Sequence, residues 1–185
     1  PLAQLLRGAM MVASYALFLQ ALTGGLPFAL AVGFVFTSPF FVAALSPLVL
    51  GEKVPLVRWL AAAIGFGGVL VALRPGVGEF QWVALFSLGS GFTYACTALL
   101  ARRLGSTEPA AVTGFYTWLM FLLGSMPFAL AGAGSWRLPA GGDIALLVLV
   151  GLIAGTAHYL IVAAYRRAPA ALIAPFEYIS IAWAA

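Results

Sequence analysis

The stretch GAMMVASYALFLQALTGGLPFALAVGFVFTSPFFVAALSPLVL, residues 8–50, decides the fold of this chain. It contains no charged residue, and it is about twice as long as the ~20 residues that a helix needs to cross a bilayer. Thr23-Gly24-Gly25 followed by Pro27 divides it, because glycine favours a turn and proline can begin the next helix. The stretch therefore predicts two membrane-spanning helices joined by a short turn.

Hydrophobic residues dominate the rest of the chain as well. They make up 64% of the 185 residues, and charged residues make up 8%, whereas about a quarter of an ordinary soluble domain is charged. A globular core of this size cannot bury so much apolar surface, so we expect lipid around it. We predict an all-α polytopic membrane protein with about seven transmembrane segments. The predicted segments are residues 8–23, 26–50, 57–73, 80–101, 109–132, 144–165 and 168–185.

The basic residues alternate between the two ends of these segments. Seven of the nine lie before or at the start of the first, third, fifth and seventh segments, and only Arg74 and Arg137 precede even-numbered ones. Cytoplasmic loops carry the excess of Lys and Arg, so the first group is predicted to be cytoplasmic. Charges scattered over short loops also argue against a nucleic-acid partner. The residues assigned to the cytoplasmic side are Arg7, Lys53, Arg58, Arg102, Arg103, Arg166 and Arg167.

An internal repeat links the second and seventh segments. A shift of 142 residues places 20–43 over 162–185 with seven identities in 24 pairs. The two copies are an odd number of spans apart, so the second is expected to be inserted upside down, as in the inverted repeats of secondary transporters. The identical pairs are Ala21/Ala163, Pro27/Pro169, Ala29/Ala171, Leu30/Leu172, Phe34/Phe176, Ser38/Ser180 and Ala43/Ala185.

Two stretches resemble a known transporter family. They are TSPFFVAALSPLVLGEKVPLVRWLAAAIGFGGVLVALRPG, residues 37–76, and GTAHYLIVAAYRRAPAALIAPFEYISIAWA, residues 155–184. Both are similar to the EamA-type ten-helix transporters of the drug/metabolite transporter superfamily. The resemblance implies a 5+5 inverted-repeat fold truncated at both ends, with helices three to nine of ten present. Residues 1–76 would be the C-terminal part of the first repeat, and 77–185 the second repeat with helix nine cut and helix ten absent.

The same resemblance implies a function. Members are multi-pass carriers of the bacterial inner membrane that move small metabolites such as vitamins, amino acids, nucleosides or sulfonium compounds by alternating access. The wording of residues 174–178, Ala-Pro-Phe-Glu-Tyr, is closest to members that take up riboflavin or S-adenosylmethionine, although the substrate itself does not carry over. The partners implied are a small-molecule substrate and the lipid bilayer, and a homodimer stays open.

Glu177 is the only carboxylate well inside a predicted segment. At ~1.5 Å per residue from Pro169 it lies ~12 Å deep, near the middle of a ~30 Å core, and His158 is expected at the same depth on the antiparallel segment. An intramembrane ionisable group suggests function. One hypothesis pairs Glu177 with His158 in a central cavity, where the acid neutralises a cationic substrate group or carries a coupling proton. The alternative is structural: His158 bonds a backbone carbonyl, and protonated Glu177 donates to a neighbouring helix.

Polar aromatic and hydroxyl side chains extend the candidate substrate site. In a cavity they could stack on a planar substrate or hold a cation; otherwise Tyr and Trp anchor helices at the membrane interface. Tyr94 and Tyr178 lie deeper than an interface anchor should, which favours binding. The predicted substrate-binding residues are Glu177, His158, Tyr178, Tyr94, Tyr159, Tyr116, Trp118 and Ser38, with Tyr15, Trp183, Ser90 and Thr93 as further candidates.

Prolines and small residues indicate where helices break and where they pack. Pro175 and Pro39 each remove a backbone hydrogen bond within a segment, which predicts a hinge or a free carbonyl near the bilayer midplane. Gly151 and Gly155 place two small residues on one helix face and predict close helix packing. The same spacing recurs in Ala61–Gly65 and Ser87–Gly91.

The sequence contains no constellation typical of an enzyme. There is no acidic pair within the segments and no nucleophile or zinc motif, and one His with one Cys cannot form a typical metal site. No nucleotide-binding loop is present, and no cofactor is predicted. Glu52, at a cytoplasmic turn, is expected to favour the start of the next helix. The prediction is a secondary transporter; the alternative is a non-transporting structural or regulatory membrane protein on the same fold.

Overall fold

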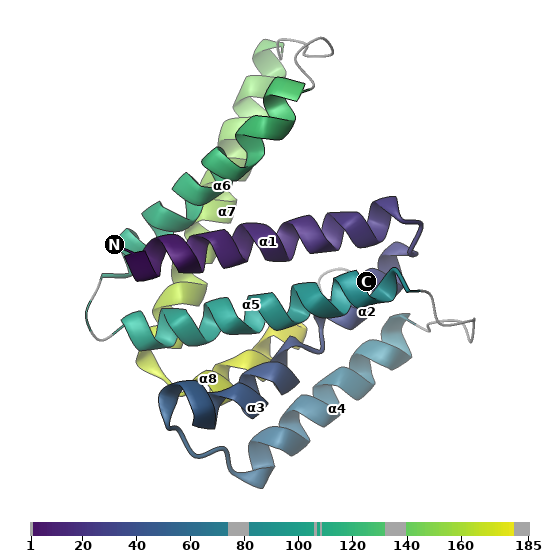
Figure 1. Cartoon of the computed structure of the whole chain (residues 1–185), viewed down its shortest axis with the longest axis vertical. Coiled ribbons are helices and arrows are strands. Elements are labelled where there is room, and N and C mark those ends of the chain that lie inside the picture. The colour runs from purple at the N-terminus through teal and green to yellow at the C-terminus, as the bar shows by residue number, and fades with distance from the viewer. Residues whose placement is uncertain (1, 74–81, 106, 108, 132–139, 180–185) are drawn as a thin grey trace.

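The structure of the chain, a computed structural model, describes residues 2–73, 82–105, 107, 109–131 and 140–179. Within these ranges the regular structure is helical throughout (Figure 1). The helices are α1 (Leu2–Thr23), α2 (Phe28–Val35), α3 (Ser38–Leu50), α4 (Leu56–Leu73), α5 (Ala84–Leu104), α6 (Ala110–Ala131), α7 (Gly141–Arg167), α8 (Ala170–Ile173) and the 3₁₀ helix η2 (Ala174–Tyr178).

The predicted segments correspond to these helices. The first, third, fourth, fifth and sixth segments match α1, α4, α5, α6 and α7, whereas the second is divided into α2 and α3 and the seventh into α8 and η2. Five stretches of the described chain are long and apolar enough to cross a membrane, and the apolar helix Leu56–Val71 is shorter. The predicted all-α polytopic membrane protein is therefore confirmed.

The helices form a layered bundle with one projecting pair (Figure 1). α1 and α5 lie side by side, and α2 and α3 pack against α5, with α4 beyond them. α6 and α7 run along each other and leave this layer at a steep angle, although α6 still packs on α1 and α7 on α5. α5 is therefore in contact with helices from both the N-terminal and the C-terminal parts of the chain, namely α1, α2, α3 and α7.

Proline begins both of the helices that the internal repeat relates. Pro27 precedes α2 with φ −54° and ψ 137°, and Pro169 precedes α8 with φ −53° and ψ 134°. The fixed φ of proline suits the residue at which an extended connection becomes a helix. The two related segments thus begin with the same backbone geometry.

Both related segments are also interrupted shortly after they begin. α2 ends at Val35, and α3 begins at Ser38 with Pro39 in its first turn. α8 gives way to the 3₁₀ helix η2, which has Pro175 in its first turn. Proline lacks an amide hydrogen, so it is favoured in a first turn, where the amide has no partner within the helix. Pro39 and Pro175 therefore lie at breaks between helical pieces, where they were predicted to act.

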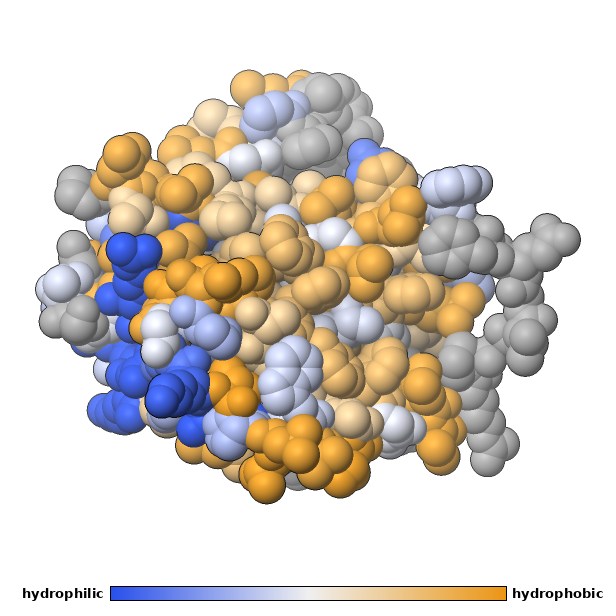
Figure 2. Space-filling model, turned by 60° about the horizontal axis from the view of Figure 1, so that its bottom comes forward, coloured by the Kyte–Doolittle hydropathy of each residue, from blue (hydrophilic) through white to orange (hydrophobic). Residues whose placement is uncertain are grey.

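The outer surface of the bundle is suited to lipid. Large apolar side chains, among them Leu48, Ile64 and Leu152, are exposed on α3, α4 and α7. Figure 2 shows apolar residues over most of the visible face and hydrophilic residues gathered toward one edge. Exposed apolar area on this scale marks a membrane-facing or partner-facing surface.

Four of the described basic residues lie at the C-terminal ends of helices. Arg102 and Arg103 are in the last turn of α5, and Arg166 and Arg167 are in the last turn of α7. A cation near the C-terminus of a helix is stabilised by the helix dipole. Arg7 is different: it was predicted to precede the first segment, but it lies inside α1 and is buried.

Glu52 ties together the ends of several helices. Its Oε1 accepts a hydrogen bond from Arg102 Nε at 2.9 Å, and its Oε2 accepts one from the backbone amide of Ala170 at 3.2 Å. Arg102 Nη1 also donates to the carbonyl oxygen of Arg166 at 2.7 Å. The predicted role of Glu52 at the start of the next helix, α4, was therefore wrong, because the carboxylate caps the start of α8 instead.

The predicted small-residue contacts are formed at two of three places. A Cβ added at Gly65 would lie 2.1 Å from the ring of Tyr178, and one added at Gly91 would lie 3.0 Å from the carbonyl oxygen of Val35. Added Cβ atoms at Gly151 and Gly155 would meet nothing within 4 Å in the described part of the chain. The packing face predicted on α7 thus makes no close contact within these ranges, and it stays a prediction.

Candidate substrate-binding site

Three segments converge on the carboxylate of Glu177. Glu177 lies in η2, and its Oε1 accepts a hydrogen bond from the hydroxyl of Tyr165 on α7 at 2.7 Å and one from the hydroxyl of Tyr94 on α5 at 3.0 Å. Hydrogen bonds to a carboxylate are roughly twice as strong as those between neutral groups. The fold thus provides donors for an acid that would be costly to bury alone.

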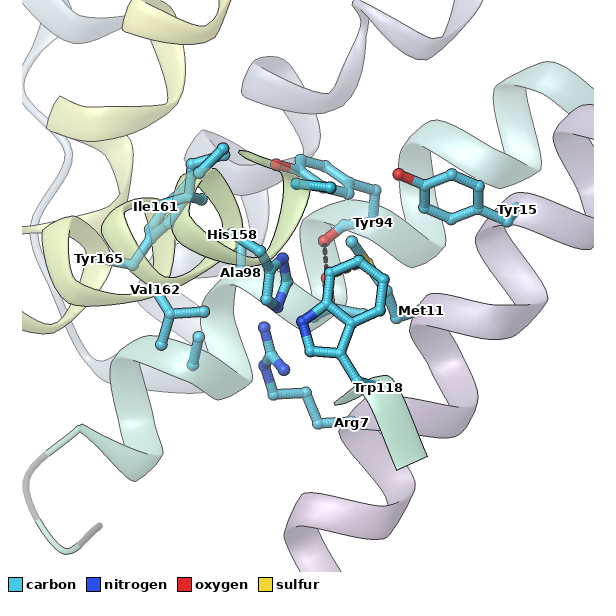
Figure 3. A pocket seen from close by; sticks show the side chains of 14 residues that line it. Arg7, Met11, Tyr15, Tyr94, Ala98, Trp118, His158, Ile161, Val162 and Tyr165 are labelled. Carbon is cyan, nitrogen blue, oxygen red and sulfur yellow. Dashed lines mark hydrogen bonds between the residues drawn. The ribbon is translucent and has the colours of Figure 1, made fainter. Parts of the chain in front are cut away.

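Two cavities adjoin this cluster. The first has a volume of about 270 Å³, and its walls include Arg7, Tyr15, Tyr94, Trp118, His158 and Tyr165 (Figure 3). The second has a volume of about 240 Å³, and its walls include Tyr15, Phe36, Ser38, Ser90, Tyr94 and Glu177. Tyr15 and Tyr94 border both cavities, so these two side chains separate them.

The predicted pairing of Glu177 with His158 is not formed. His158 lines the first cavity and Glu177 the second, and no hydrogen bond joins them among the described residues. His158 instead contacts the indole of Trp118 edge to face, with ring centroids 5.8 Å apart. Its Nε2 is buried and has no hydrogen-bond partner among the described residues. Tyr94 and Tyr165 supply the hydrogen bonds that the prediction sought from the histidine.

The other predicted binding residues divide into two groups. Tyr94, Trp118 and Ser38 line a cavity, and so does the further candidate Tyr15, whose ring packs edge to face on that of Phe121 with centroids 5.0 Å apart. Three predicted tyrosines lie outside both cavities, and Trp183 lies outside the described residues. The three are Tyr116, whose ring packs on Phe115, Tyr159, which is 46% exposed, and Tyr178.

Tyr178 connects the two interrupted segments. Its hydroxyl donates to the carbonyl oxygen of Phe36 at 3.0 Å, and the two rings have centroids 5.7 Å apart. These residues are 142 positions apart in the sequence, which is the shift of the internal repeat. The carbonyl that Tyr178 reaches lies at the break between α2 and α3. Tyr178, the last residue of η2, therefore connects the interrupted seventh segment to the break between α2 and α3, and it lines neither of the two cavities.

Sequence reasoning missed Arg7 and Tyr165. The sequence does contain a sign that Arg7 is buried. The spacing of Gln4, Arg7 and Ser14 places these polar residues on one face of a helix whose other residues are mostly apolar, and that face is buried. Tyr165 was harder to predict from the sequence, because the depth of each residue in the membrane was estimated at its Cα atom and the length of the side chain was left out. A tyrosine four residues before Pro169 is shallower than Glu177, but its long side chain reaches the carboxylate.

Comparison with known proteins finds bacterial transporters. The chain is 36% identical over 166 residues to a riboflavin transporter of Rhizobium johnstonii, covering 88% of this chain and 54% of that protein. It is 30% identical over 175 residues to a riboflavin transporter of Vibrio cholerae, covering 94% of the chain and 58% of that protein. It is 24% identical over 146 residues to an S-adenosylmethionine uptake transporter of Rickettsia felis, covering 79% of the chain and 49% of that protein.

The chain therefore spans about half the length of the curated relatives it matches. No protein-family model matches it, so the resemblance to EamA-type transporters stays a prediction. No solved structure gives a significant match. The names of these relatives are those of transporters and not of enzymes, which agrees with the prediction that the chain has no enzymatic activity.

Proposed function

We propose that this chain forms the binding region of a secondary transporter for a small metabolite of the riboflavin or S-adenosylmethionine class. The observation that carries the proposal is the carboxylate of Glu177, which lines the second cavity inside a bundle of apolar helices. It is held by the hydroxyls of Tyr94 and Tyr165, two side chains that line the first cavity. The names of the relatives, a riboflavin transporter and an S-adenosylmethionine uptake transporter, support this class of substrate. Transport would follow alternating access in a bacterial inner membrane.

The chemistry of Glu177 supports a binding role. A carboxylate in an apolar bundle costs several kcal/mol unless it is paired or hydrogen-bonded. Tyr94 and Tyr165 reduce that cost without neutralising the charge, because a hydroxyl donates a hydrogen bond and keeps its proton. A carboxylate held in this way can attract a cationic group or accept a hydrogen bond from an N–H or O–H of the substrate. It can also take up a proton, which would couple transport to a proton gradient.

Aromatic side chains supply the remaining surface of the site. Tyr15, Tyr94 and Trp118 line the cavities, and their rings can stack on a planar ring system such as a flavin or an adenine. Each cavity is smaller than the ~300–1,000 Å³ typical of small-molecule sites. Since Tyr15 and Tyr94 border both cavities, a shift of these two side chains would join them into one site.

The interrupted segments supply a means of movement. Tyr178 joins the breaks of the two repeat-related segments through the Phe36 carbonyl, while Glu52 holds the ends of α5 and α8 together. In alternating access one repeat moves against the other around a central site. The division into repeats at residues 1–76 and 77–185 is part of this proposal, and the matching geometry at Pro27 and Pro169 supports it.

The proposal is tested by transport in a defined system. The full-length protein is reconstituted into proteoliposomes, and uptake of radiolabelled riboflavin and S-adenosylmethionine is compared with that of protein-free vesicles. We expect saturable uptake of at least one of them, reduced by an excess of the same unlabelled compound. Absence of uptake of both compounds, and of a panel of amino acids and nucleosides, would favour the non-transporting alternative.

A further inference from the structure

Arg7 is a buried cation whose donors are incompletely used. Arg7 is 3% exposed, although it is the one charged residue of α1. One terminal nitrogen, Nη1, donates to the hydroxyl of Thr117 on α6. The Nε–H has no hydrogen-bond partner among the described residues. A guanidinium stays charged in proteins, so this position carries a positive charge with a donor to spare.

The described acidic residues are engaged elsewhere. Glu52 pairs with Arg102 in the one salt bridge of the described ranges. Asp143 accepts from the backbone amide of Ala140 at the start of α7, and Glu177 accepts from two tyrosines. A buried charge without an opposite charge costs several kcal/mol. The charge of Arg7 therefore favours the binding of a negative group beside it.

His158 is a second donor in the same cavity. Figure 3 shows the side chains of Arg7 and His158 pointing toward each other, with the indole of Trp118 beside them. The Nε2 atom of His158 is buried and has no partner among the described residues. In the tautomer that carries a proton on Nε2, it can donate a hydrogen bond to a ligand oxygen. Arg7 from α1 and His158 from α7, each with a nitrogen that has no partner among the described residues, thus line one cavity of about 270 Å³.

We infer that Arg7 and His158 form a subsite for a negatively charged group of the substrate, a carboxylate or a phosphate. Both groups offer several oxygens, and the guanidinium binds them with two parallel hydrogen bonds when its geometry allows. This inference rests on the proposed function, since the group is taken to belong to the transported molecule. The anion would occupy the first cavity, while a cationic or donor group would face Glu177 in the second.

The arrangement orients a polar substrate. The positive Arg7 lines the first cavity, Glu177 lines the second, and Tyr15 and Tyr94 lie between them. A molecule with a negative end and a positive or donor end would therefore bind in one direction. A neutral ring system would use only the aromatic walls. The charge of one end of the molecule thus becomes a determinant of specificity.

Two matched pairs of compounds test the inference. The first pair is S-adenosylmethionine and its decarboxylated analogue, which differ by a carboxylate. The second is riboflavin 5′-phosphate and riboflavin, which differ by a phosphate. Binding to the purified full-length protein in lipid nanodiscs is measured by equilibrium dialysis. We expect the wild-type protein to bind the member of one pair that carries the additional carboxylate or phosphate at least about tenfold more tightly, as hydrogen bonds to a charged group imply, and the pair concerned identifies the group.

Variants of Arg7 test whether this residue causes the preference for the carboxylate or phosphate. Arg7→Gln should weaken binding of the compound with the carboxylate or phosphate by roughly 10- to 100-fold and change binding of its counterpart without that group by less than about threefold. Arg7→Lys keeps the charge but lacks Nε, so it should retain part of the preference. Arg58→Gln, an arginine of α4 outside both cavities, is the matched control and should behave like wild type. If Arg7→Gln does not fold, Arg7→Lys and the wild-type preference decide the matter.

The outcomes separate this inference from the proposed function. Equal binding of both members of each pair by the wild type would overturn the subsite, as would an equal loss of both members in Arg7→Gln, and so would absence of binding by all four compounds. Uptake without a preference for the anion would remove the subsite and leave the transporter. An Arg7-dependent preference without uptake would leave the subsite and remove the transporter.

Discussion

At the scale of single residues, one carboxylate oxygen organises the site. Glu177 Oε1 accepts from both Tyr94 and Tyr165, so α5, α7 and η2 are held at one point. A hydrogen bond to a charged group contributes about 1.5–3 kcal/mol. Loss of either donor therefore has a measurable effect on how the carboxylate is placed in the second cavity.

The substitution Tyr165→Phe tests this arrangement. Phenylalanine keeps the ring and removes only the hydroxyl that donates to Glu177, so we expect the protein to fold and the affinity for its substrate to fall by roughly tenfold. Tyr159→Phe is the matched control, since Tyr159 lies on the same helix but is exposed and outside both cavities. Equilibrium dialysis measures both variants. Equal affinity in the two would mean that the Tyr165 hydroxyl does not support the site.

Sequence reasoning identified the acid but not its partners. Glu177 was predicted because a lone carboxylate in an apolar segment is costly without a role. His158 was predicted as its partner from equal depth, which ignores the direction and length of side chains. Tyr165 reaches the carboxylate from a shallower level. Arg7 was predicted to lie in a loop because a charged residue beside an apolar stretch is usually taken as the boundary of the membrane-spanning segment.

At the scale of helices, glycine decides where α4 meets η2. The Cα of Gly65 faces the ring of Tyr178 so closely that an added Cβ would lie 2.1 Å from it. Tyr178 is fixed in turn by its hydrogen bond to the Phe36 carbonyl. A side chain at position 65 would therefore displace the residue that joins the two helix breaks.

Gly65→Ala is predicted to destabilise the protein by about 1–3 kcal/mol, the usual cost of overpacking a tight contact. Gly155→Ala is the control: its Cβ would meet nothing within 4 Å in the described ranges, and alanine is the better helix former. Thermal unfolding in detergent should show a lower midpoint for the first variant and an unchanged or higher midpoint for the second. Similar midpoints would contradict the close packing of α4 on Tyr178.

The helices themselves were predictable, and their breaks only in part. Long uncharged stretches set the positions of α1, α5, α6 and α7, because lipid imposes a length on each span. Pro39 and Pro175 indicated that the second and seventh segments are weakened. The change from α8, which has four residues, to the 3₁₀ helix η2 depends on tertiary contacts. Such contacts cannot be predicted from a single sequence.

At the scale of the whole molecule, the basic residues predict how the chain is inserted. Lys53 lies on the side assigned to the cytoplasm, and Asp143 lies at the start of α7, on the opposite side. Both residues are exposed. The excess of Lys and Arg on one side is the feature that sets orientation in membrane proteins.

Cysteine labelling tests the orientation. In a background in which Cys96 is replaced by Ala, Lys53→Cys and Asp143→Cys are treated with a membrane-impermeant maleimide in intact cells. We expect Asp143→Cys to react and Lys53→Cys to react only after the membrane is permeabilised. The reverse pattern would invert the assigned topology, and labelling of both sites in intact cells would mean that the two ends of the bundle are not on opposite sides.

The repeat was visible in the sequence at this scale, but its contact was not. Seven identities in 24 pairs related the second and seventh segments. Only the structure brings Phe36 and Tyr178, which are 142 residues apart, into contact. If a two-fold axis relates the two repeats, equivalent residues of the repeats can contact each other only near that axis. The contact therefore supports the proposed inverted repeat, with the binding site beside it.

The most direct test of the central claim is the uptake rate of Glu177→Gln. Glutamine keeps the shape of the side chain and an oxygen that accepts from the tyrosines, but it removes the charge. Asp143→Asn, the same change at the exposed start of α7, is measured beside it in proteoliposomes. We predict that Glu177→Gln loses substrate uptake by roughly tenfold or more while Asp143→Asn matches wild type. Wild-type uptake by Glu177→Gln would contradict the assignment of Glu177 to the transport site.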